Sequence, residues 1–323
     1  MKKKPIAAAL LIIVLLTACA DSTGSSGADD RDKISIVATT FPIYDWMKEI
    51  IGEDNPDIAL TLLLDNGTDL HSYEPTISDI TDIAGCDMFI HVGGVSDAWI
   101  KDVLKTNTNS NMVSISLLEL IADRVKEEEL VEGMTQEPGY EHGEEEPDEH
   151  VWLSIKNAEA ACRGLGEKLR LIDSKSGASI ESNLKAYVSK LSELDSRYES
   201  LISDAEYDTL VFCDRFPFRY LVDDYNLNYF APFAGCSTET EASFETITLL
   251  SSKVDELGLK NVMVIETSDQ SIAKTVIANT QRKDQEILVL NSMQSVTADE
   301  LASGISYLSV MEKNLNVLTQ ALS

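Results

Sequence analysis

Residues 178–203 read ASIESNLKAYVSKLSELDSRYESLIS and contain neither proline nor glycine. Their apolar residues recur at steps of three and four, from Ile180 through Leu191 to Leu201. This spacing places them in one stripe along a helix. At ~1.5 Å per residue the helix would be about 39 Å long. We predict a stiff helix that joins two domains and limits how far they hinge; a helix internal to one domain is the alternative.

Short apolar runs alternate with helix-like stretches on both sides of this segment. The strand candidates before it are Ile34–Thr39, Ile58–Leu64, Met88–Val92 and Met112–Ile115, and those after it are Thr209–Cys213, Asn228–Ala231, Val262–Ile265 and Glu286–Leu290. The helix candidates are Pro42–Ile51, Thr76–Ala84, Ser96–Lys105, Phe216–Asp224, Glu241–Leu257, Ser271–Asn279 and one within Ala298–Leu322. Such alternation predicts parallel sheets covered by helices. We therefore expect an α/β fold with two Rossmann-like lobes, residues 33–177 and 204–323, joined by the helix at 178–203.

The first 18 residues have the pattern of a targeting segment. Three lysines precede an apolar run from Ile6 to Leu16, which is too short to span a bilayer comfortably. The run ends in LTAC at residues 16–19, which is similar to a lipobox, although an ordinary secretory signal is the alternative. We expect a signal peptide at 1–18, a lipid on Cys19 that anchors the protein to the outer face of the cell membrane, and a flexible tether at 19–32.

The composition is strongly acidic, with 55 Asp and Glu residues against 26 Lys and Arg residues and a net charge of −29. This balance argues against nucleic acid as a partner. It suits a cationic ligand, but it also suits solubility alone. Much of the charge lies in residues 127–149, a loop whose prolines and glycines break any helix. Such a block is usually solvated, and here it could at most concentrate cations.

Three histidines lie near the ends of predicted strands, where open α/β sheets bind their ligands. His71 follows the strand candidate Ile58–Leu64, and His150 follows the acidic loop. His91 lies inside a strand candidate, which is more typical of a structural residue. His71 and His150 are therefore the first candidates for metal ligands.

Ionisable or polar residues also end the strands of the second half. They are Cys213, Asp214, Glu266 and Asn291. Imidazole with carboxylate or thiolate donors makes a zinc site, and suits Mn²⁺ less well. A cysteine that ends an apolar strand is more often a buried hydrophobe. Cys213 could instead pair with Cys236, because an extracytoplasmic compartment permits disulfides, but spacing does not say which cysteines pair.

Several segments resemble the metal-binding proteins of zinc and manganese ABC importers. Residues 69–75, DLHSYEP, resemble that family's D-P-H-x-[FY]-E-P segment, and residues 148–153, DEHVWL, resemble D-[PE]-H-x-W-L. Residues 235–241, GCSTETE, are similar to G-I-S-x-E-x-E, and residues 307–322 resemble the family's last helix. The order and spacing of these motifs are more specific than any one of them.

The resemblance implies two α/β lobes, one backbone helix and a metal in the cleft between the lobes. His71 and His150 match the family's first two ligands. The chain departs from the pattern at Cys213, which stands in place of a histidine, and at Asn291, which stands where a carboxylate is expected. We therefore predict a metal site with these members: His71, His150, Glu266, Asp214 and Cys213, supported by Asn291 and His91.

The predicted function is capture of Zn²⁺ and its delivery to the permease of an ABC importer, by a monomeric lipoprotein. Mn²⁺ is the main alternative ligand, since only the acidic loop and the candidate thiolate favour zinc. A zinc hydrolase with Glu266 as general base is disfavoured, because the chain has no HExxH motif. A surface adhesin on the same fold is a further alternative.

Overall fold

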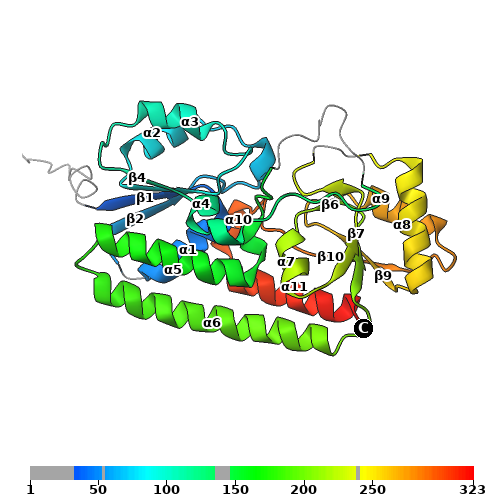
Figure 1. Cartoon of the computed structure of the whole chain (residues 1–323). Coiled ribbons are helices and arrows are strands. Elements are labelled where there is room, and N and C mark those ends of the chain that lie inside the picture. Colours follow the sequence, from blue (N-terminus) through cyan, green and yellow to red (C-terminus); the bar gives the residue numbers. More distant parts are fainter. Residues whose placement is uncertain (1–32, 53–54, 135–145, 238–240) are drawn as a thin grey trace, which may run out of the picture. The chain divides into compact units, whose positions relative to one another are not determined.

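The computed structural model describes residues 33–52, 55–134, 146–237 and 241–323 (Figure 1). The predicted signal peptide and tether, and the middle of the acidic loop, lie outside the described residues. From Ile34 to Ser323 the chain forms one compact unit. Within the described residues, no helix is long and apolar enough to cross a membrane.

The first half contains a parallel four-stranded sheet of order β2-β1-β3-β4. Its strands are β1 Ile34–Ala38, β2 Ile58–Leu62, β3 Met88–His91 and β4 Val113–Ser116. All four predicted strands are present, with ends that differ by one or two residues. Because neighbouring strands run in the same direction, the loops after β2 and β3 leave from the same edge of the sheet.

Helices cover both faces of this sheet, as Figure 1 shows for α2 and α3 on one side and α1 on the other. Their bounds are α1 Phe41–Ile51, α2 Ile77–Gly85, α3 Ile100–Val103 and α4 Leu117–Leu120. The start of α2 is set by a capping box, in which Thr76 and Asp79 satisfy each other's backbone N–H groups. The predicted helix Ser96–Lys105 is shorter in the structure, where it consists of α3 and a 3₁₀ turn. Residues 96–99 form turns instead, and Ser96 contacts the site described below.

The second half carries a smaller set of parallel strands. They are β5 Thr209–Val211, β6 Arg215–Phe216, β7 Asn228–Phe230, β8 Phe233–Ala234, β9 Asn261–Val264 and β10 Glu286–Val289. β5 pairs with β7, β9 pairs with β10, and a bridge from Phe212 to Met263 connects the two pairs. The short pair β6–β8 was not predicted, since strands of two residues have no alternation to detect.

The remaining helices of the second half agree with the predicted series. They are α7 Arg219–Asp224, α8 Phe244–Leu257, α9 Ser271–Asn279, α10 Ala298–Ala302 and α11 Tyr307–Ala321. α8 ends at Gly258, which has a left-handed conformation with φ of 67°. Ser306 caps α11 with Ser309 in a capping box, so the single helix expected within Ala298–Leu322 divides in two.

The long helix forms as α6, Gly177–Ser203, and packs beside α5, Ile155–Ile172. α5 was not predicted; its two internal glycines weaken the helical signal. A Cβ added at one of them, Gly166, would lie 2.8 Å from the Leu184 side chain of α6, so the glycine permits close packing of the two helices. α6 also contacts α1 and α11, and the Tyr198 hydroxyl donates to the Met311 carbonyl at 2.6 Å. It therefore packs against helices from both halves of the chain.

Candidate metal centre

The loop after β2 carries His71 into the site on a 3₁₀ turn, Leu70–Ser72. Asp69 caps this turn by accepting the His71 backbone N–H at 3.0 Å, and its second oxygen accepts from Arg215 at 2.6 Å. The imidazole Nδ1 of His71 lies 2.7 Å from the Ser96 hydroxyl. These contacts fix the ring and direct its Nε2 away from the loop.

His150 lies in the segment that follows the acidic loop and has no exposed surface. Asp148 Oδ1 accepts hydrogen bonds from both the backbone N–H and Nδ1 of His150, each at 2.8 Å. Tyr220 of α7 holds this segment by donating to the Asp148 carbonyl at 2.8 Å. A proton on Nδ1 leaves the Nε2 lone pair free to bind a metal, as in metal-binding histidines whose other nitrogen is held by a carboxylate.

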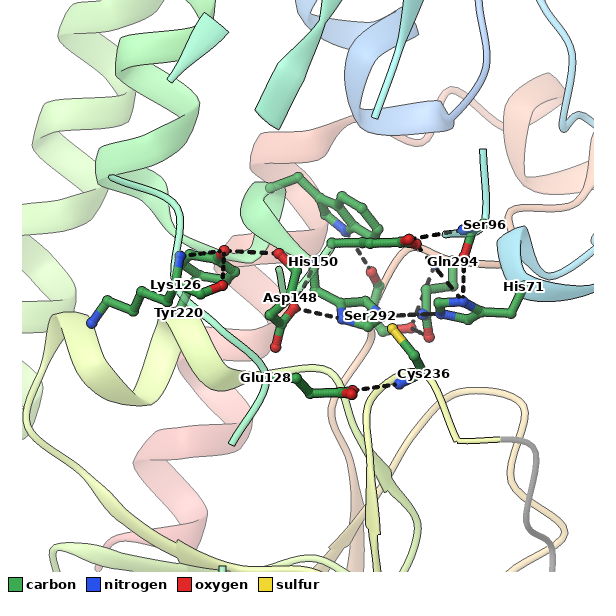
Figure 2. A network of polar contacts seen from close by, with 12 residues as sticks. His71, Ser96, Lys126, Glu128, Asp148, His150, Tyr220, Cys236, Ser292 and Gln294 are labelled. Atoms are coloured by element: carbon green, nitrogen blue, oxygen red, sulfur yellow. Dashed lines mark hydrogen bonds and ion pairs between the residues drawn. The ribbon is translucent and has the colours of Figure 1, made fainter. Parts of the chain in front are cut away.

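The two rings bring their Nε2 atoms to 3.1 Å from each other. The thiol of Cys236 completes a group in which all three ligand atoms lie within 4.8 Å of one another. Figure 2 shows the sulfur directed toward the two rings. In a tetrahedral zinc site with Zn–N of about 2.05 Å, two nitrogens are about 3.3 Å apart. The histidine pair is therefore close to the spacing that zinc requires.

Cys236 reaches this position because Gly235 passes directly against His150. A Cβ at Gly235 would lie 2.7 Å from His150 Cε1 and 3.0 Å from the Phe216 carbonyl oxygen. The Cys236 backbone N–H donates to Glu128 at 3.2 Å, which ties it to the start of the acidic loop. Only glycine at 235 allows the chain to lie this close to the imidazole.

Gln294 is the fourth side chain at the centre. Its Nε2 lies 2.6 Å from His150 Nε2 and 3.0 Å from His71 Nε2 (Figure 2), and its Oε1 lies 3.1 Å from the Ser292 hydroxyl. Met293 beside it has a φ of 59°, a left-handed conformation that is unfavourable for a residue other than glycine. The turn after β10 therefore accepts backbone strain at the point where it directs Gln294 to the histidines.

Glu266, a predicted ligand, contacts Ser292, and Ser292 in turn contacts Gln294. Its carboxylate accepts from the Ser292 backbone N–H at 2.7 Å and from the Ser292 hydroxyl at 2.8 Å. Because a hydroxyl has one proton, Ser292 cannot also donate to Gln294. The amide of Gln294 rotated by 180° would donate to Ser292 and present its oxygen to the histidines. Glu266 thus positions the turn that bears Gln294.

The electrostatic surroundings favour a cation at this point. Burial and, next in importance, the neighbouring His150 lower the pKa of His71 to about 3, so His71 is neutral near pH 7. Burial alone would lower the pKa of His150, but Asp148, Glu149 and Glu128 raise it above its usual value. The same carboxylates that would hold a proton on His150 would stabilise a divalent cation there.

Two predicted ligands lie apart from the histidine group. Cys213 is buried within the apolar cluster formed by β5, β9, α8 and α9, and burial raises the pKa of its thiol. Asp214 accepts from the Arg215 backbone N–H at 2.9 Å. Both line a cleft of about 390 Å³ that also reaches Asp69 and His71. They border the approach to the centre, whereas the group of close ligand atoms does not include them.

The two supporting residues have structural contacts. His91 stacks on Phe89, and its Nε2 lies 3.3 Å from the Ser114 hydroxyl. Asn291 caps the turn after β10 by accepting from the Met293 backbone N–H at 2.8 Å. His91 is not among the close ligand atoms.

The sequence did not point to Cys236 or Gln294, which the structure places beside the two histidines. Cys236 had a detectable signal, because a cysteine follows a glycine in the segment that resembles the G-I-S-x-E-x-E turn of the importer family. Gln294 had none, since a neutral amide three residues past a strand does not point to a metal. Cys213 and Cys236 do not pair, and the four described cysteines are all free thiols.

A parallel α/β chain that gathers two imidazoles, a thiol and an amide at one point has the donor set of a metal-binding protein. The chain belongs to the family described as zinc-uptake complex component A, periplasmic, whose model matches residues 36–321. This membership confirms the predicted family.

Individual relatives agree with this assignment. The chain is 30% identical over 325 residues to the zinc-binding lipoprotein AdcA of Streptococcus pneumoniae, covering 99% of this chain and 61% of AdcA. It is 28% identical over 315 residues to the high-affinity zinc uptake system protein ZnuA of Bacillus subtilis, covering 96% and 94%. The chain thus spans less than two thirds of the length of AdcA.

A solved structure has the same fold. The Zn(II)-bound ZnuA-like domain of Streptococcus pneumoniae AdcA superposes with a TM-score of 0.69 at 28% identity, covering 90% of this chain and 99% of that domain. The match confirms the predicted α/β class with parallel sheets.

Proposed function

We propose that this chain captures Zn²⁺ at His71 and His150 and delivers it to the permease of an ABC importer. The observation that carries the proposal is the 3.1 Å approach of the two Nε2 atoms, each on a ring whose Nδ1 has its own partner. The names of AdcA and ZnuA, which describe zinc binding and zinc uptake, support zinc as the cargo.

The proposed site would join the two halves of the chain. His71 and His150 precede α6, whereas Gln294 follows it, so a bound ion would connect the predicted lobes across the cleft beside Asp214. Coupling between capture and lobe arrangement requires contacts that differ between states, and donors from both halves would supply them. We further propose a monomer anchored by lipid on Cys19 at the extracytoplasmic face, as the lipoprotein name of AdcA suggests.

Zinc affinity measured by chelator competition on the chain without residues 1–18 tests this function. We expect one tightly bound Zn²⁺. His71→Ala and His150→Ala should each weaken binding by more than the roughly 10–100-fold that loss of an outer partner costs. His91→Ala is the matched control and should retain wild-type affinity, because its ring contacts Phe89 and Ser114 instead.

Three results would contradict the proposal: no retained zinc, unchanged affinity in both ligand variants, or displacement of zinc by equimolar Mn²⁺. Circular dichroism of each variant separates loss of a ligand from loss of the fold, which matters for the buried His150.

A further inference from the structure

We propose that Cys236 binds the captured zinc through its sulfur, in a centre of two histidines and one thiolate with the Gln294 amide as fourth donor. This inference rests on the proposed function and names the ligands that complete its site. The step is a simple exchange, in which the Zn–S bond forms and the thiol proton leaves to solvent.

The first argument is distance. With Zn–S of about 2.3 Å and Zn–N of about 2.05 Å, a tetrahedral ion separates sulfur from nitrogen by about 3.6 Å. The Cys236 sulfur and both Nε2 atoms already lie within 4.8 Å of one another. A movement of about 1 Å by one side chain therefore closes the site, which is within the reach of a rotamer adjustment.

The second argument is placement. Gly235 lets the backbone lie against the His150 ring, and Glu128 holds the backbone N–H of Cys236. These two contacts leave the thiol facing the histidines. A cysteine that only fills an apolar core would not need a glycine beside it. Here the glycine at 235 makes room for the His150 ring next to Cys236.

The third argument is charge. The other members of the centre are neutral, because Gln294 is an amide and a metal-binding imidazole carries no charge. A thiolate supplies the one negative donor. Structural zinc is commonly held by mixed nitrogen and sulfur donors, so the set is suited to zinc.

Cys213 cannot take this role in the present fold. Its thiol lies in the apolar cluster around Val211, Val264 and Leu250, and its side chain is outside the group of close ligand atoms. It therefore serves as a matched control of the same residue type in the same half of the chain.

A thiolate ligand would make the site selective for Zn²⁺ over Mn²⁺. Thiolate donors favour Zn²⁺ and softer ions, whereas Mn²⁺ prefers carboxylate, carbonyl and water oxygens. A centre with one thiolate and no carboxylate should therefore discriminate against Mn²⁺. Replacing Cys236 by serine should reduce the ratio of zinc affinity to manganese affinity as well as the zinc affinity itself.

Cobalt(II) as a spectroscopic probe tests the thiolate. The chain from residue 19 onward, carrying Cys19→Ala to remove the thiol at the predicted lipid site, is titrated with Co²⁺. We expect a near-ultraviolet thiolate-to-cobalt charge-transfer band together with visible ligand-field bands. Cys236→Ser should abolish the charge-transfer band, and Cys213→Ser should retain it.

The outcomes separate the inference from the function on which it rests. Ligand-field bands without charge transfer, or a charge-transfer band lost in Cys213→Ser instead, would overturn the role of Cys236 and leave metal capture intact. Failure to bind either Co²⁺ or Zn²⁺ would overturn metal capture itself. If Cys236→Ser does not fold, alkylation of the unsubstituted thiol decides: zinc should protect Cys236 from N-ethylmaleimide, and equal labelling with and without zinc would refute the inference.

Discussion

Asp45 offers a test of the electrostatics of the core. Its carboxylate lies in α1 with 3% of its surface exposed and accepts the Tyr307 backbone N–H at the start of α11, at 2.8 Å. Burial raises its pKa from 3.8 to about 6, although the Tyr307 hydrogen bond lowers it in part. Near pH 7 the fold therefore holds a buried negative charge.

The sign and size of the effect follow from this shift. A raised carboxyl pKa means that the folded protein holds the proton more tightly than the unfolded chain. The protonated, neutral Asp45 therefore contributes to the free energy of unfolding. This contribution is fully present below pH 3.8 and is lost as the pH rises through about 6. The shift of about two pKa units corresponds to about 3 kcal/mol. Asp45→Asn keeps an oxygen for Tyr307 and removes the charge, so 3 kcal/mol is the upper limit of its gain at pH 8.

Thermal unfolding of the metal-free chain at pH 4.5 and pH 8 measures this difference. A gain of 3 kcal/mol in a domain of this size raises Tm by about 5 °C. We expect a rise of at most that size at pH 8 and a much smaller one at pH 4.5, with the exposed Asp123→Asn as an inert control. A variant whose Tm is lower than wild type by the same amount at both pH values would refute the reasoning.

Three further changes, with one control, test the site and the anchor. Gly235→Ala should weaken zinc binding by roughly tenfold in chelator competition, as for a displaced ligand partner, because its Cβ would lie 2.7 Å from His150 Cε1. Gly177→Ala meets nothing within 4 Å and should have no effect. Gln294→Glu should tighten zinc binding by about tenfold, or roughly 1.4 kcal/mol, by adding a charged donor, and unchanged affinity would show that this side chain does not reach the ion. Cys19→Ala should move the protein out of the membrane fraction on ultracentrifugation, and unaltered fractionation would exclude a lipid there.

The fold class was predictable because its signals are local. Apolar runs of four to six residues and the stripe from Ile180 to Leu201 report which side chains must leave water, and this depends little on distant segments. Errors arose where that signal was weak. α5 was not predicted because its glycines weaken the helical signal, and the strands β6 and β8 are too short to show alternation.

His71 and His150 were also predictable, since each lies in a motif that holds its own ring: Asp69 caps the first turn, and Asp148 binds the second imidazole. The second half of the site was not. Glu266 follows a strand as expected, yet its carboxylate accepts hydrogen bonds from Ser292 and does not contact the histidines. Ser292 precedes Gln294 by two residues.

The sequence by itself therefore determined the α/β architecture, the long helix and two of the side chains of the proposed metal centre. Only the tertiary structure brought Cys236 and Gln294 to them. The physical reason is that burial patterns are set along each segment, whereas a metal centre is set by the distances between segments. Those distances depend on how the turns after β8 and β10 pack against the His150 loop, including the space left by Gly235 and the left-handed Met293.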